Sequence, residues 1–157
     1  MKNSFIAVLL IAVRGWRRAI FMTYEEWERE IPASISDDVL WKMRVYRYAL
    51  FLSELAWSDV TKLMDDRRTV ALADQLYRAV GSISANLAEG YSRYTGKDRA
   101  RFYAYSLGSA RESRDWHYKS RHILGNVVFE HRAQFLAQII RQLKTIIAKE
   151  RNTAIQK

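Results

Sequence analysis

The scarcity of residues that interrupt helices is the feature that most restricts what this chain can fold into. Pro32 is the only proline in 157 residues, and the six glycines are spread thinly along the chain. A fold of many short strands needs more of both residues, because proline and glycine supply the backbone angles of tight turns. The sequence therefore favours a small number of long helices.

Four long helices are predicted from apolar residues that recur every three or four positions. We expect them over residues 37–64, 69–91, 95–124 and 126–149. The charged turn 65–68, the loop 92–94 and Gly125 would separate them. Short loops between long helices predict an all-α fold, an antiparallel up-down-up-down four-helix bundle.

The helix ends are predicted from residues that satisfy free backbone groups. Ser36, Thr95 and Asn126 are the expected N-terminal caps, since their side-chain oxygens accept a hydrogen bond from a backbone N–H. Gly90 is the expected C-terminal cap of the second helix, because glycine adopts the left-handed conformation at little cost.

The apolar residues of the first and last helices predict which faces are buried. Those of the last helix are Phe129, Leu136, Ile139, Ile140, Leu143, Ile146 and Ile147. Those of the first helix are Val39 or Leu40, Met43, Tyr46, Leu50, Ser53, Trp57, Val60 and Met64. The first helix has more apolar surface than one core requires, which predicts that a second face meets another subunit.

The two ends of the chain are predicted to lie outside the bundle, which we assign to residues 37–149. Residues 1–36 form an N-terminal extension and residues 150–157 a frayed tail. The apolar run Phe5–Val13 has nine residues, whereas a membrane span needs about 20, and the basic residues after it are a poor cleavage region for a signal peptide. The composition changes abruptly at Met22, which favours residues 1–21 as the product of a misassigned start. A short membrane-surface or docking helix is the alternative.

The chain has a formal net charge of +9, and this charge is unevenly distributed. Residues 23–38 contain six acidic side chains against Arg29, and the chain from Val39 onward is strongly basic. Such an excess favours anionic partners, nucleic acid first and an anionic membrane surface second. The alternative is a helical surface with a basic bias and no such partner. The absence of cysteine excludes disulfides and thiolate chemistry and agrees with the cytoplasmic location that we predict.

A polar stripe follows one side of the predicted second helix. Its members are spaced by four, four and three residues: Arg78, Ser82, Asn86 and Glu89. We interpret the stripe as a structural seam, hydrogen-bonded to Ser109 and Glu112 of the third helix, with an Arg78–Glu112 ion pair that fixes the helix register. A ligand site is the alternative.

The same helix and the next contain a set of residues that resembles a known family. The set is Gln75, Arg78-Ala79, Ser82-Ile83, Asn86, Ala88-Glu89-Gly90, Arg93, Arg101-Phe102, Gly108-Ser109 and Glu112. It resembles the bacterial four-helix-bundle proteins encoded in 23S ribosomal RNA intervening sequences, a family similar in turn to the accessory variability determinant of diversity-generating retroelements. The resemblance covers residues 39–149. It implies a bundle that assembles into a barrel-like homopentamer with a basic surface, and it implies nucleic-acid association by analogy with the retroelement protein.

Basic residues in and before the third helix are the predicted nucleic-acid contacts. They are Arg93, Lys97, Arg99, Arg101, Arg111, Arg114, Lys119 and Arg121. Such stripes contact phosphates without recognising sequence. Nearby tyrosines would stack on unpaired bases, namely Tyr91, Tyr94, Tyr103, Tyr105 and Tyr118. The alternative is that the arginines are a solvated face and the tyrosines belong to the core or to subunit contacts.

Enzymatic chemistry has little support in the sequence. Arg111 and His117 resemble the motif of HEPN-type helical ribonucleases, but six residues of helix rotate by about 240°, so the two do not share a face. His117, His122 and His131 lack carboxylates at metal-ligand spacing. We predict no catalytic residue, metal or cofactor.

The sequence thus predicts a non-enzymatic, homo-oligomeric nucleic-acid-associated or adaptor protein, whose partners are its own copies, RNA or DNA, or another protein. A purely structural protein–protein module is the first alternative, and a helical ribonuclease is the second.

Overall fold

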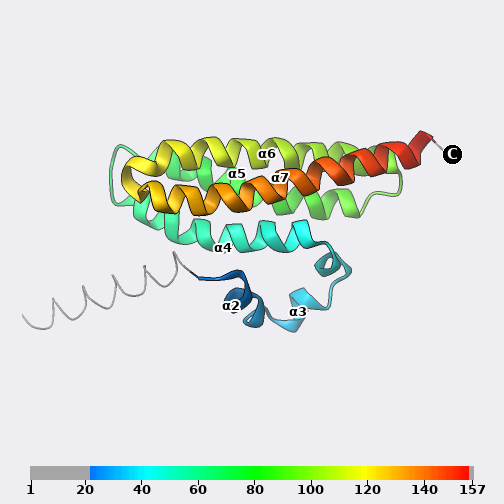
Figure 1. Cartoon of the computed structure of the whole chain (residues 1–157), viewed down its shortest axis with the longest axis horizontal. Helices are drawn as coiled ribbons and strands as arrows, with labels where there is room; N and C mark the ends of the chain where they lie inside the picture. The colour runs from blue at the N-terminus through cyan, green and yellow to red at the C-terminus, as the bar shows by residue number, and fades with distance from the viewer. Residues whose placement is uncertain (1–21, 156–157) are drawn as a thin grey trace, which may run out of the picture.

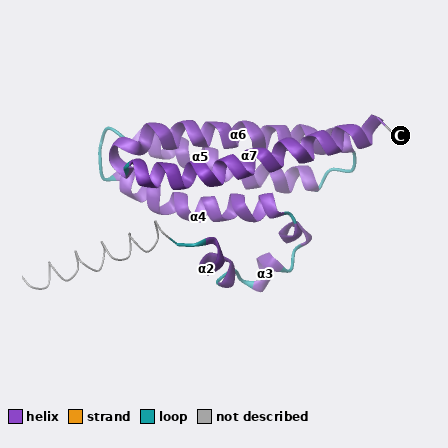
Figure 2. Ribbon diagram, viewed as in Figure 1, coloured by secondary structure: helices purple, strands orange, loops and turns teal. Residues whose placement is uncertain are grey.

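Four long helices form the body of the protein in the computed structural model, which describes residues 22–155 (Figure 1). They are α4 (Arg44–Met64), α5 (Val70–Tyr91), α6 (Gly96–Leu124) and α7 (Asn126–Ile155). Two short helices, α2 (Tyr24–Arg29) and α3 (Ala33–Ser36), and the 3-10 turn η1 (Val39–Lys42) precede them. Helices joined by short loops account for the described chain, which confirms the all-α prediction (Figure 2).

The long helices run alternately in opposite directions (Figure 1). Each packs on the next one in the chain, α4 and α7 meet to close the bundle, and α4 also touches α6 across its centre. This is the predicted antiparallel up-down-up-down bundle. Within the described residues, no helix is long and apolar enough to cross a membrane.

Both ends of α5 and α6 and the start of α7 lie within one residue of the predicted positions. The Thr95 hydroxyl accepts a hydrogen bond from the backbone N–H of Asp98 at 3.1 Å and so caps α6 as predicted. Gly125 has a φ of 90°, which glycine tolerates best, and the chain reverses there. Asn126 is the first residue of α7 and not its N-terminal cap as predicted, since the carbonyl oxygen of Gly125 accepts the hydrogen bond from the Phe129 N–H at 3.2 Å. That helix continues to Ile155, six residues beyond the predicted end.

The first long helix begins later than predicted. Instead of a helix that starts at Asp37 behind a Ser36 cap, α3 ends at Ser36 and η1 follows. The Asp38 carboxylate accepts a hydrogen bond from the backbone N–H of Leu40 at 2.8 Å. This local bond favours a turn. Met43, with a ψ of 105°, has an extended backbone and so separates η1 from α4.

The predicted core face of α4 is wrong for most of its length. Trp57 and Met64 are each 61% exposed. Val60 is buried as predicted. The other residues that α4 buries lie on a neighbouring stripe, about 100° around the helix: Val45, Tyr48, Ala49, Phe51, Leu52, Leu55, Ala56, Asp59 and Leu63. Apolar side chains surround most of α4, so two different stripes satisfy the helical period, and only the neighbouring helices decide between them.

The segment from Met22 to α4 packs against the bundle. Thr23 and Glu26 form a capping box at the start of α2, and Trp27 is buried against Phe51. The rings of Phe51 (α4) and Phe135 (α7) lie 5.1 Å apart at the same place. The part of the predicted extension that contains Met22, Tyr24, Trp27 and Ile31 therefore packs where α4 meets α7. The prediction for residues 1–21 lies outside the described residues.

Gly90 is a site of close helix packing and not the predicted left-handed cap. It is helical and buried, α5 ends one residue later at Tyr91, and Ser92 is the C-cap. A Cβ atom on Gly90 would lie 2.7 Å from Cε1 of Tyr103 and 3.0 Å from Cβ of Phe102. The absence of a side chain at this position lets α6 approach α5.

Replacement of Gly90 by alanine should lower the free energy of unfolding by about 1–3 kcal/mol, because the buried ring of Tyr103 must move. Gly81 provides a matched control in the same helix, since a Cβ there meets nothing within 4 Å. Gly81→Ala should stabilise the protein by about 0.5–1 kcal/mol. Urea denaturation measures both changes, and equal stabilities for the two variants would contradict the packing role of Gly90.

Candidate nucleic-acid interface

Small residues form the inner face of α6, and this arrangement sends its long basic side chains outward. The buried residues include Ala100, Ser106, Ala110, Ser113 and Ser120. The Ser106 hydroxyl donates to the carbonyl oxygen of Ile83 in α5 at 2.8 Å, so this buried hydroxyl is satisfied by the backbone. The lysines and arginines of this helix consequently lie on its solvent-facing side or at the borders of its buried face.

The eight predicted contact residues fall into two groups. We call Arg93, Lys97, Arg99 and Arg101 the loop patch, since they surround the α5–α6 loop. We call Arg111, Arg114, Lys119 and Arg121 the helix patch. Ten residues separate Arg101 from Arg111, which corresponds to about 15 Å of helix. The predicted stripe is therefore interrupted.

Ion pairs within the protein occupy most of the loop patch. Nε of Arg99 donates to Oε2 of Glu150 in α7 at 2.8 Å, and its Nη1 donates to the carbonyl oxygens of Arg93 and Tyr94, each at 3.1 Å. Arg99 is thus a structural clamp that ties the loop to α7. Arg93 pairs with Glu89, and Arg101 lies 3.7 Å from Asp98.

The helix patch retains uncompensated charge. Lys119 pairs with Asp115 at 2.5 Å, and the Arg121 guanidinium lies 3.8 Å from the centroid of the Tyr118 ring. Arg111 and Arg114 are exposed, and in the part of the chain that the structure describes no hydrogen bond or ion pair holds either side chain. With Asp115, Tyr118 and Phe129 they line a shallow groove of about 270 Å³, which we call the α6–α7 groove.

The predicted stacking tyrosines are not equivalent. Tyr94 is fully exposed, Tyr91, Tyr105 and Tyr118 are partly so, and Tyr103 is buried. Tyr103 packs against Gly90, so the prediction that it stacks on bases is wrong. Burial also raises its pKa to about 12. Tyr118 is the tyrosine that lies in the α6–α7 groove.

The predicted hydrogen-bonded seam between α5 and α6 is absent from the described structure. Arg78 is exposed and lies 3.8 Å from Asp74, and Glu112 accepts a hydrogen bond from Nε1 of Trp116. The Arg78–Glu112 pair is therefore wrong. The remaining members also bond within their own helices or to the adjoining loop: Ser82 to Arg78, Asn86 to Ser82, Glu89 to Arg93, and Ser109 through its carbonyl to Ser113. The stripe is a half-exposed outer face of α5.

A buried charged cluster, absent from the sequence predictions, joins three of the long helices. The Arg132 guanidinium (α7) donates two hydrogen bonds to the Asp59 carboxylate (α4), from Nε at 2.8 Å and from Nη2 at 2.9 Å. His117 (α6) places Nε2 3.5 Å from Oδ2 of Asp59, and its Nδ1 lies 2.8 Å from the carbonyl oxygen of Ser113. All three side chains are fully buried.

The neighbours of Asp59 favour its charged form despite its burial. Desolvation favours the neutral carboxylic acid, but His117 and Arg132 outweigh it and lower the pKa of Asp59 below its ordinary value. Nδ1 of His131 accepts a hydrogen bond from Nη1 of Arg132 at 2.6 Å. Burial and the adjacent guanidinium lower the pKa of His131, which agrees with an imidazole that serves as an acceptor.

The sequence contained a signal for the cluster. Arg132 stands at a core position of α7, three residues after Phe129 and four before Leu136, and an arginine at such a position needs a buried partner. In the sequence, His117 and Arg111 resemble a ribonuclease motif. His117 is buried whereas Arg111 is exposed, so the two lie on different faces, as the helical rotation predicts.

The comparison with known families decides the relationship of this chain. The family model described as 23S rRNA-intervening sequence protein matches residues 41–149, which include α4, α5, α6 and most of α7. The chain belongs to the 23S rRNA-intervening sequence protein family. The buried cluster and the α6–α7 groove both lie within the part that the family model covers. No curated protein and no solved structure matches the chain.

Replacement of Arg132 by methionine should lower the free energy of unfolding of this family member by about 3–5 kcal/mol, because it leaves the Asp59 carboxylate buried without its guanidinium. The double variant Asp59→Leu/Arg132→Met removes both charges and should recover at least half of that loss. Arg78→Met is the surface control and should change stability little, since its pair with Asp74 is exposed.

Urea denaturation compares these variants. An Arg132→Met variant as stable as the wild type would contradict the role of the cluster. So would a double variant whose loss of stability equals the sum of the losses in the single variants Asp59→Leu and Arg132→Met.

Proposed function

We propose that this family member is a non-enzymatic nucleic-acid-binding protein that attracts RNA or DNA to a basic face repeated around a homo-oligomer. The observation that supports this most is the pair of exposed, uncompensated guanidinium groups of Arg111 and Arg114 on α6. Exposed cations that the protein does not pair are free to bind phosphates and to release the counterions around them.

The distribution of charge supports the same proposal. The acidic residues of 23–38 belong to the segment that packs on α4. Figure 1 shows α6 at the edge of the bundle away from α2 and α3. The acidic segment therefore leaves the basic charge of α6 uncompensated, and a polyanion can approach that edge.

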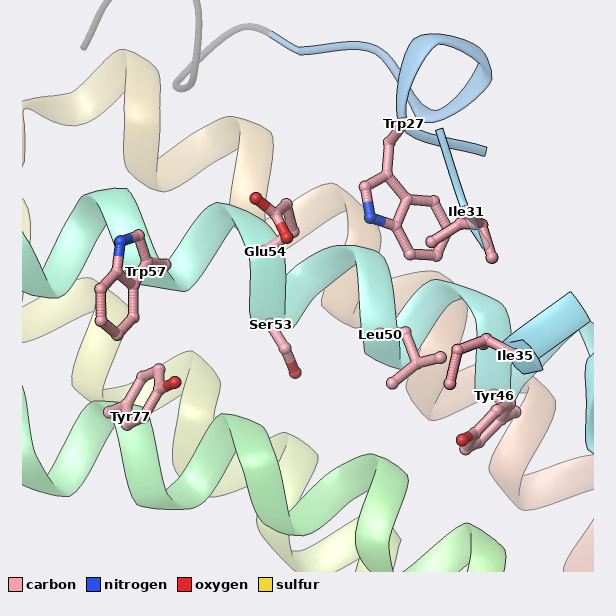
Figure 3. A pocket seen from close by; sticks show the side chains of 9 residues that line it. All are labelled: Trp27, Ile31, Ile35, Tyr46, Leu50, Ser53, Glu54, Trp57 and Tyr77. Carbon is pink, nitrogen blue, oxygen red and sulfur yellow. The ribbon is translucent and has the colours of Figure 1, made fainter. Parts of the chain in front are cut away.

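Self-association is the second part of the proposal, and an exposed aromatic groove supports it. Trp57 (α4) and Tyr77 (α5) are both exposed, with ring centroids 6.0 Å apart. They belong to a groove of about 370 Å³, shown in Figure 3 and lined also by Trp27, Ile31, Ile35, Tyr46, Leu50, Ser53 and Glu54. Large exposed apolar side chains of this kind favour burial against another chain. In a homo-oligomer, for which the family resemblance implies five copies, each weak phosphate contact would be repeated and the avidity raised.

The same aromatic groove favours a second candidate function, that of a protein–protein interaction module without nucleic-acid binding. Aromatic side chains are enriched in protein interfaces. In that case the groove binds a different protein and the basic face of α6 serves solubility.

Salt-dependent binding of a labelled single-stranded RNA tests the proposal. Affinity should fall steeply with salt, and Arg111→Gln/Arg114→Gln should reduce the slope of log K against log salt by about 1.4 for each protomer in contact, since two phosphate contacts are lost. Arg67→Gln/Arg78→Gln removes the same charge away from α6 and should leave the slope nearly unchanged.

Two results would contradict the proposal. Absence of binding at low salt would favour the protein–protein module. Equal slopes for the two double variants would show that net charge, and not the face on α6, attracts the RNA.

A further inference from the structure

We propose that the α6–α7 groove binds an unpaired nucleotide, so that the protein prefers single-stranded nucleic acid to a duplex. This inference rests on the proposed function and assigns its substrate class. The groove combines two chemical groups that a single strand requires, cations for the phosphates and an exposed aromatic ring for a base.

The helical spacing of α6 places these groups together. Arg111 and Arg114 are three residues apart, and Tyr118 follows four residues later, so all three share one face of the helix. Along the helix axis, Tyr118 stands about 6 Å from Arg114. The groove thus offers phosphate contacts and a stacking surface within the span of one nucleotide and its neighbour.

Two neighbours hold the Tyr118 ring in position, and part of the tyrosine is exposed. It meets the Phe129 ring of α7 edge-on, with centroids 5.4 Å apart and an interplanar angle of 71°. The Arg121 guanidinium lies over the ring and donates from Nη1 to the Tyr118 carbonyl oxygen at 2.8 Å. The tyrosine is nevertheless 49% exposed. A ring fixed in this way loses little conformational entropy when a base stacks on it.

The charges around the groove are compatible with a phosphate at Arg111 and Arg114. Asp115, the carboxylate in the lining, pairs with Lys119 at 2.5 Å. The Glu112 carboxylate accepts a hydrogen bond from Trp116. The groove therefore keeps an excess of positive charge, contributed by Arg111, Arg114 and Arg121.

The buried cluster provides the rigid base of this site. Arg132 follows Phe129 by three residues in α7, and His117 precedes Tyr118 in α6. Because Arg132 and His117 both meet Asp59, the register of α6 against α7 is fixed where Tyr118 and Phe129 touch.

A preference for single strands follows from what each partner exposes. In a duplex the faces of the bases are stacked on one another, so Tyr118 could meet only the ends. In a single strand each base has a face free to stack, and one such contact changes affinity by about tenfold. Arg111 and Arg114 would contact the phosphates of either partner.

Fluorescence anisotropy with a short single-stranded RNA and its blunt duplex, at one salt concentration, tests the inference. The wild type should bind the single strand about tenfold more tightly. Tyr118→Leu keeps an apolar contact with Phe129 and should lose about that factor for the single strand alone, whereas Tyr118→Phe should keep it. Tyr118→Phe, which keeps the ring, is thus the matched control for Tyr118→Leu.

The outcomes separate this inference from the proposed function. If the wild type binds the two RNAs with equal affinity and Tyr118→Leu does not change either affinity, the single-strand site is overturned. Binding of nucleic acid by charge would still hold in that case. No binding of either RNA would overturn both. A strand that contains 2-aminopurine provides a second measurement in the unsubstituted protein, where stacking should change its fluorescence, and an unchanged signal would overturn the inference.

Discussion

The buried ion pair between Asp59 and Arg132 is the interaction on which the arrangement of the bundle depends. It joins α4 to α7 with two hydrogen bonds, and His117 brings α6 to the same point. Apolar contacts tolerate small shifts of one helix along another, whereas a bidentate pair is satisfied in a single register. The cluster therefore adds specificity to a core whose stability comes from leucine, isoleucine and valine.

This internal constraint determines what the outside of the bundle can present. Serines and alanines line the inner face of α6, so that the helix lies close to its neighbours and its arginines point outward. Arg99 is used to clamp the α5–α6 loop to Glu150. Arg111 and Arg114 remain exposed, beside an aromatic ring that Phe129 supports. The candidate binding surface consists of the basic side chains that are not used in ion pairs within the protein.

The sequence predicted the four helices and their order because long periodic stretches and few turn residues leave little choice. It failed where two local readings were equally good. Both stripes of α4 have a helical period, and only the neighbouring helices distinguish Leu52 from Trp57. A glycine such as Gly90 is compatible both with a helix C-cap and with close packing of two helices. Only the position of the Tyr103 ring in the folded protein shows that close packing is its role. The polar stripe that begins at Arg78 resembles a seam, but the bond that fixes the register is made by Asp59 and Arg132, 73 residues apart.

The proposed binding depends on repetition of the basic face in an assembly, and the intact mass of the native protein tests this most directly. Mass measurement under non-denaturing conditions should give several copies per particle, and addition of a short RNA should give particles in which one strand is shared by the whole assembly. A protein that stays a monomer alone and with bound RNA would contradict the claim, because a single basic face would then account for all of the binding.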